Sequence, residues 1–169
     1  MNILQILPRE LYKFHYDGDL QKIFDYIVKL SDQDHKRFGL LYETAANNPV
    51  SVMDIHVPEF AKEFKDIYKF MMNSVEEVIN HLKFQHPDFF MQQVWTNLHW
   101  LPDQGHIRHV HPNSIFSSIF NVRCLPPNNV TTFHGGTPSG DEDAVMLQHV
   151  YTNEQFPDGT RLLSETSDG

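Results

Sequence analysis

The sequence has little of several features that would place it in particular classes of protein. Its longest apolar runs, such as residues 3–7 and 145–147, are far shorter than the roughly 20 residues that a helix needs to cross a bilayer. Lys and Arg number only 13 against 22 Asp and Glu, so the formal net charge is -9. Proteins bind nucleic-acid backbones mainly through Lys and Arg. We therefore expect neither a membrane span nor binding to a nucleic-acid backbone.

Cysteine is almost absent as well. The single thiol, Cys124, has no second cysteine with which to form an internal disulfide, which is typical of a reducing compartment. The N-terminus also lacks the basic flank and long apolar segment of a secretory signal. We predict a cytoplasmic protein, and its 169 residues fit a single domain.

Two stretches of the first half have helical spacing. Apolar residues recur every three or four positions over residues 17–28 and again over residues 60–82, where Pro58 suits the first turn. The second stretch is the longest predicted helix. Residues 31–57, between the two, are polar and interrupted by Gly and Pro, which indicates connecting chain with at most a short strand or turn.

The second half changes character after Pro87. Short segments rich in β-branched and aromatic residues alternate with turns of Pro, Gly and Asn, a pattern typical of strands. The predicted strands are 92–101, 107–111, 115–124, 130–133, 144–151 and 161–165. This order predicts an α+β fold, with residues 1–90 as a helical part and residues 91–169 as an antiparallel β core.

Histidine, in contrast, is frequent, with 11 residues in all and four of them between His99 and His111. Histidine is the commonest metal ligand and the usual acid or base near neutral pH. Because alternate side chains of a strand share a face, His109 and His111 would present two imidazoles to one place, whereas His106 has the opposite parity. From the spacing alone, a metal site and two unrelated surface histidines are equally good interpretations.

The wider sequence resembles a family of 2-oxoglutarate- and Fe(II)-dependent oxygenases of the prolyl-hydroxylase-like type, common in phages and marine bacteria. The family pattern W-x-N, G, H-x-H-P-x-S and S-G-V-Y-Y is resembled by residues 95–97, Gly105, residues 109–114 and residues 117–120. Residues 144–153 are similar to the family's strand that ends in a histidine, and residues 161–164 to its closing strand. The resemblance covers nearly the whole chain. It implies an N-terminal strand and two helices packed on a double-stranded β-helix core, a cupin-like jelly roll.

The same resemblance implies a site of three histidines and one arginine. His109, His111 and His149 occupy the positions of the Fe(II) ligands, and Arg161 that of the residue that holds the distal carboxylate of 2-oxoglutarate. Arginine suits this role because its planar fork pairs with a carboxylate and keeps its charge. Asn97 is expected to help bind the cosubstrate. The expected pocket residues are Trp95, Ser118 and Phe120, and for Trp95 a role in the core is an equally good interpretation.

Three features depart from the family pattern. The second ligand is usually Asp or Glu but is His111 here, so either three imidazoles bind the metal or only one of His109 and His111 does. The family's tyrosines after Ser118 are missing, which removes hydrogen-bond donors. Finally, only 40 positions separate His109 from His149, fewer than expected of the family.

The sequence therefore predicts an oxidoreductase, an Fe(II)- and 2-oxoglutarate-dependent dioxygenase that hydroxylates an unknown protein side chain or small molecule. Two alternatives stay open. One is a β-helix that kept its fold, lost turnover and serves as a binding or structural module. The other is a three-histidine, cupin-type dioxygenase that does not use 2-oxoglutarate. The sequence also leaves a homodimer open.

Overall fold

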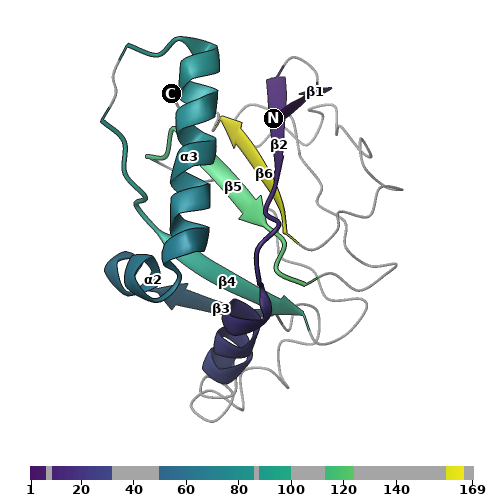
Figure 1. Ribbon diagram of the computed structural model, residues 1–169, viewed down its shortest axis with the longest axis vertical. Coiled ribbons are helices and arrows are strands. Elements are labelled where there is room, and N and C mark those ends of the chain that lie inside the picture. The colour runs from purple at the N-terminus through teal and green to yellow at the C-terminus, as the bar shows by residue number, and fades with distance from the viewer. Residues whose placement is uncertain (7–8, 32–49, 86–87, 100–112, 124–158, 166–169) are drawn as a thin grey trace, which may run out of the picture.

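The computed structural model describes residues 1–6, 9–31, 50–85, 88–99, 113–123 and 159–165 (Figure 1). In chain order, the elements are β1 (Asn2–Ile6), β2 (Arg9–His15), a helix over residues 21–31, β3 (Val50–Ile55), α2 (Val57–Glu63), α3 (Lys65–Leu82), β4 (Val94–His99), β5 (Phe116–Phe120) and β6 (Thr160–Glu165). The described part thus combines helices with antiparallel sheets. A double-stranded β-helix is not seen within these ranges, and the strands predicted at 107–111, 130–133 and 144–151 lie outside them.

Four strands form one antiparallel sheet in the order β1-β2-β6-β5. The strand β6 lies between strands from both halves of the chain, because Arg161 is opposite Phe14 of β2 on one side and Phe120 of β5 on the other. Residues directly opposite each other share a face of the sheet, so these three side chains lie on the same side. This sheet joins the N-terminal strands to the C-terminal one in a single unit (Figure 1).

A second sheet has two antiparallel strands, β3 and β4, which are paired along their full length from Val50 opposite His99 to Ile55 opposite Val94. In this register Trp95 lies opposite Asp54, and Asn97 lies opposite Val52.

Two apolar clusters hold these elements together. The first, called here the helix cluster, joins the helix over residues 21–31 to β3, α2 and the start of α3, and its buried members are Ile23, Ile27, Ile55, Phe60, Phe64, Ile67 and Met71. The second, the sheet cluster, packs α3 against the four-stranded sheet, and its buried members are Tyr12, Phe14 and Val78. The long helix α3 contributes residues to both clusters. It covers the face of the sheet on which the side chain of Arg161 lies.

The predicted helix over residues 60–82 is wrong in one respect, because two helices meet at Phe64. The backbone of Phe64 has φ -119° and ψ 49°, outside the helical region. Hydrogen bonds nevertheless run through the junction, from the Phe64 amide to the Phe60 carbonyl at 2.9 Å and from the Tyr68 amide to the Phe64 carbonyl at 2.8 Å. The junction is therefore a kink. Phe60 and Phe64 both lie in the helix cluster, with ring centroids 5.6 Å apart.

The predicted strands at 92–101, 115–124 and 161–165 are confirmed as β4, β5 and β6, with somewhat shorter bounds for the first two. The N-terminal part is less helical than predicted, since β1 and β2 lie in it, whereas β3 lies in the segment for which the sequence leaves a short strand open. The sequence of β2 does not have the alternating pattern of a strand. Its adjacent residues Leu11 and Tyr12 point to opposite faces, and each is only 1% exposed. A strand covered on both faces does not alternate apolar and polar residues.

Within the described residues, none of the helices combines the length and the apolar character that crossing a bilayer requires.

Candidate functional site

Five of the eight predicted site residues lie in the described part of the chain. They are Trp95, Asn97, Ser118, Phe120 and Arg161. The three predicted iron ligands, His109, His111 and His149, lie outside it. Among the residues that are described, no group of three or more His, Cys, Asp or Glu side chains is placed to hold a metal ion.

Arg161 is the most deeply buried charged residue of the described part, with a relative exposure of 3%. It reaches from β6 to two other elements. Its Nη1 donates a hydrogen bond to the carbonyl oxygen of Met71 in α3, and its Nη2 donates to Oγ of Ser118 in β5 at 3.1 Å. The structure therefore brings together two predicted site residues, Arg161 and Ser118, beside a third, Phe120, which lies opposite Arg161 in the sheet.

The guanidinium of Arg161 is only partly satisfied by these contacts. Its Nε is buried and has no hydrogen-bond partner among the described residues. None of the described carboxylates forms an ion pair with it. Burial lowers the pKa of Arg161 to about 9, so the side chain keeps its charge at neutral pH. A buried charge without an opposite charge costs free energy, and an anion is the partner that would offset this cost.

The direction of the Arg161 side chain limits how such an anion reaches it. Its hydrogen bond to Met71 shows that it lies on the face of the sheet that α3 covers. By the alternation of a strand, Ser117 and Ile119 of β5 belong to the opposite face. An anion bound to Arg161 would have to enter between the sheet and α3. Because Met71 and Ser118 already use two donors, the same contacts also suit a structural arginine that ties α3 to β5.

Phe120 packs in the interior next to Arg161. Its ring is half-buried and lies 6.1 Å from the ring of Tyr16 and 6.0 Å from that of Phe70, measured between centroids. Phe120 also packs against the helix cluster. The aromatic residues around it form an apolar wall beside the buried charge, and burial in such surroundings strengthens any charge pairing there.

The two predicted site residues of β4 lie in the second sheet. Asn97 is exposed and Trp95 is half-buried, and they share a face of β4 because they are two positions apart. Thr96, between them, points to the other face, where its Oγ1 is buried without a hydrogen-bond partner in the described part. In these ranges no hydrogen bond joins Asn97 to Arg161, so the structure does not bring the two predicted cosubstrate residues together.

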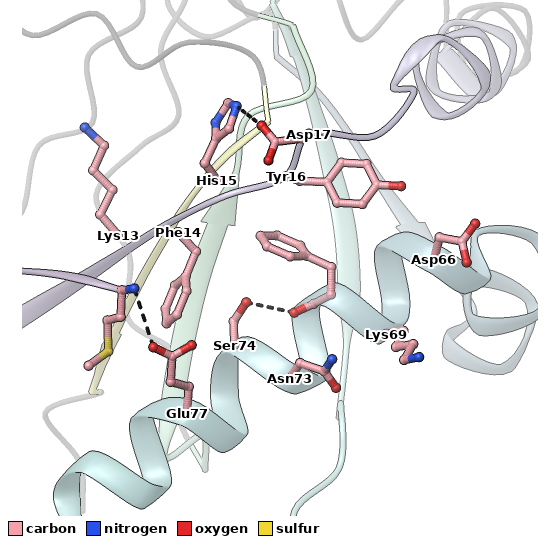
Figure 2. A pocket seen from close by; sticks show the side chains of 12 residues that line it. Lys13, Phe14, His15, Tyr16, Asp17, Asp66, Lys69, Asn73, Ser74 and Glu77 are labelled. Carbon is pink, nitrogen blue, oxygen red and sulfur yellow. Dashed lines mark hydrogen bonds and ion pairs between the residues drawn. The ribbon is translucent and has the colours of Figure 1, made fainter.

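Sequence reasoning missed a cleft between the end of β2 and α3, with a volume of about 850 Å³ (Figure 2). The rings of Phe14, Tyr16 and Phe70 line it, together with charged residues of β2 and α3. A weak signal exists in the sequence, because the polar residues of α3 that face the cleft recur every three or four positions. Their spacing alone reads as an ordinary solvated helix face.

Comparison with protein-family models, with curated proteins and with solved structures gives no match for this chain. What the chain does must therefore be inferred from its own residues.

Proposed function

We propose that the chain is an Fe(II)- and 2-oxoglutarate-dependent dioxygenase that hydroxylates an unknown protein side chain or small molecule. In this proposal His109, His111 and His149 hold the iron, and Arg161 holds the distal carboxylate of 2-oxoglutarate. The bound iron and 2-oxoglutarate supply the oxidising chemistry, whereas the protein supplies ligands, orientation and a shielded cavity. Because Cys124 is the only cysteine, we place this activity in the cytoplasm.

The observation that supports the proposal most is the state of Arg161. A guanidinium that is 3% exposed, has no acidic partner in the described residues and keeps a buried Nε without an acceptor is suited to a carboxylate ligand. The hydroxyl of Ser118, which accepts a hydrogen bond from Nη2, steadies the side chain next to that free donor. This much fits the carboxylate of 2-oxoglutarate.

A second candidate function is a non-catalytic module of the same ancestry. The contacts of Arg161 with Met71 and Ser118 favour it, because they give the arginine a structural task that needs no ligand. A three-histidine dioxygenase that does not use 2-oxoglutarate is a third possibility for the histidines. It uses the metal site of the first proposal, but it does not require Arg161 as a ligand for 2-oxoglutarate.

The proposal is tested by measuring Fe(II) binding and the release of CO₂ from 2-oxoglutarate, both with purified protein. We expect one Fe(II) per chain by anaerobic calorimetry, and loss of binding in the His109→Ala and His149→Ala variants. The matched control is His56→Ala, since His56 is an exposed histidine that precedes α2. Absence of Fe(II) binding would leave only the non-catalytic module. The three-histidine dioxygenase would be favoured if the protein bound iron but released no CO₂, and if Arg161→Met bound iron equally well.

A further inference from the structure

The cleft between β2 and α3 is lined by aromatic rings and by charges of both signs (Figure 2). Phe14 of β2, Tyr16 just after this strand and Phe70 of α3 contribute the rings. The ring centroids of Tyr16 and Phe70 are 5.2 Å apart, so these two rings form one apolar surface. The volume of the cleft, about 850 Å³, lies within the range of small-molecule pockets.

Tyr16 is held in place from two sides. Its backbone amide donates a hydrogen bond to the carbonyl oxygen of Gly159 at 2.9 Å. The hydroxyl end of its ring lies directly against Gly18, where a Cβ atom would collide with the ring. Burial raises the pKa of Tyr16, and the negative charges of Asp66 and Asp19 raise it further, so the hydroxyl stays protonated at neutral pH. The aromatic part of the cleft is therefore formed before any ligand arrives, which favours binding.

Three polar side chains of α3 line the cleft at the end where Tyr16 lies (Figure 2). They are Asp66, Lys69 and Asn73, and their spacing of three and four positions places them on one face of the helix. All three residues are exposed. Within the described part of the chain, none of these side chains forms an ion pair or a hydrogen bond. Their charges and hydrogen-bonding groups are thus available to a ligand.

The spacing of the two charges indicates which ligand fits. Side chains three positions apart on a helix have Cβ atoms about 5–6 Å apart, so Asp66 and Lys69 present opposite charges one turn from each other. A free α-amino acid carries an ammonium and a carboxylate on one carbon and matches this short spacing. In an extended peptide the terminal charges lie much further apart. A zwitterion also adds no net charge to a cleft that is lined by both signs.

We propose that this end of the cleft binds a free α-amino acid with an apolar side chain. The ammonium group of the ligand pairs with Asp66. Its carboxylate pairs with Lys69 and accepts a hydrogen bond from the side-chain amide of Asn73. Its apolar side chain packs on the rings of Tyr16 and Phe70. The site does not depend on iron or on 2-oxoglutarate.

The test compares four ligands with the full chain. L-Phenylalanine has all the groups that the site recognises, 3-phenylpropionate lacks the ammonium, 2-phenylethylamine lacks the carboxylate, and L-serine lacks the apolar ring. Titrations followed by amide chemical shifts report the affinity and the place of binding. We expect phenylalanine to bind with a Kd of about 1 mM and to shift the signals of Tyr16, Lys69 and Phe70. Each singly charged analogue should bind about 2- to 5-fold more weakly, as expected for the loss of one exposed ion pair. L-Serine should not reach saturation, because the apolar contact is lost.

Variants of the two charged residues assign the contacts. Asp66→Asn should weaken the binding of phenylalanine and 2-phenylethylamine about 2- to 5-fold but should not weaken that of 3-phenylpropionate. Lys69→Met should weaken phenylalanine and 3-phenylpropionate and spare 2-phenylethylamine. The matched controls are Glu76→Gln and Lys65→Met, because both residues are exposed on α3 and do not line the cleft.

Gly18→Ala tests the aromatic part of the site. The added methyl group displaces the ring of Tyr16, so all three aromatic ligands should bind more weakly. Gly18 is exposed, and a thermal melt checks that this variant and the others are folded.

Two results would overturn the proposal. One is the absence of saturable shifts with phenylalanine at about 20 mM, well above the expected Kd. The other is an Asp66→Asn variant that binds phenylalanine as tightly as the parent protein, or that weakens 3-phenylpropionate equally, since the ammonium would then not be recognised. Because none of these measurements uses iron, failure here leaves the proposed dioxygenase untouched, and the reverse also holds.

Discussion

The helix cluster and the sheet cluster differ in how they deal with polar groups. All buried members of the helix cluster are apolar. In the sheet cluster, the buried Tyr12 carries a hydroxyl group. Tyr12 donates to Oε2 of Glu10 at 2.6 Å, and Nε2 of His81 lies 3.2 Å from the same oxygen.

Arg161 lies at the border between the two clusters. The side chain of Met71 belongs to the helix cluster, but its carbonyl oxygen accepts the hydrogen bond from Arg161. An apolar core is the less costly way to hold α3 in place, because burying polar groups costs free energy unless they are fully paired. Where a chain leaves buried polar groups incompletely paired, a bound ligand is a physical explanation to test. The difference between the clusters therefore makes the four-stranded sheet and α3 the part of the molecule in which a ligand site is to be sought.

The largest expected effect lies in the helix cluster. Phe60→Ala should lower the free energy of unfolding by about 3–5 kcal/mol, because it leaves a cavity where a fully buried ring was packed. Urea denaturation followed by circular dichroism measures the loss. The control is Phe90→Ala, since Phe90 is 82% exposed and its loss should cost less than about 0.5 kcal/mol. Equal losses in the two variants would break the distinction between core and surface on which the comparison depends.

The border between the clusters should respond differently, and with a pH dependence. Arg161→Met should change the free energy of unfolding at pH 7 by no more than about 1 kcal/mol, because two lost hydrogen bonds are offset by the relief of a buried charge. The folded pKa of about 9 lies well below the ordinary pKa of arginine in an unfolded chain, so the native state releases its proton first. Stability of the parent protein therefore rises relative to Arg161→Met above pH 9, by up to about 2 kcal/mol at pH 10.5.

Urea titrations of both proteins at pH 7, 8, 9.5 and 10.5 check this expectation. Groups other than Arg161 titrate in the same range, but they are common to both proteins and cancel in the difference. A loss of more than about 3 kcal/mol in Arg161→Met at pH 7 would mean that the arginine is a structural tie, which would favour the non-catalytic module.

A smaller effect is expected from the polar contacts of the sheet cluster. Tyr12→Phe removes the hydroxyl that donates to Glu10 and should cost about 1 kcal/mol, the usual net value of such a bond. The ring stays buried, so no cavity forms. Urea denaturation at pH 7 gives the value. No change at all would mean that this hydrogen bond does not stabilise the sheet cluster.

The smallest effect concerns the surface of the helix cluster. Lys22 lies 2.9 Å from Oε1 of Glu63, and the hydrogen bond and charge of Lys22 lower the pKa of Glu63. Lys22→Met should raise this pKa towards its ordinary value. The stabilisation by this pair is present above the unfolded pKa of Glu63 and is lost as the pH falls through the lower, folded pKa. An NMR titration of the Glu63 carboxyl carbon shows the shift, and an unchanged pKa would contradict the pairing.

The sequence predicts some elements of this fold well and others poorly, for physical reasons. The strands β4, β5 and β6 are short and rich in β-branched or aromatic residues between turns, so their local pattern is sufficient. The strand β2 is covered on both faces and lacks a period of two. The kink at Phe64 has no glycine or proline next to it that would mark it in the sequence.

The candidate site shows the same limit more strongly. The resemblance to the oxygenases singles out Arg161 and Ser118, and the structure joins them by a hydrogen bond. The contact of Arg161 with Met71 spans 90 positions and cannot be read from either segment alone. The placement of His109, His111 and His149 stays a prediction.

The central claim is that this chain binds Fe(II) through its histidines and 2-oxoglutarate through Arg161. Its most direct test is an anaerobic titration of the metal-free protein with Fe(II) and then with 2-oxoglutarate, followed by visible absorption. The account predicts the weak metal-to-ligand charge-transfer band of chelated 2-oxoglutarate in the parent protein. In Arg161→Met it predicts iron binding with the band shifted to much higher 2-oxoglutarate concentration. A protein that binds no iron, or binds it and never develops the band, would contradict the account.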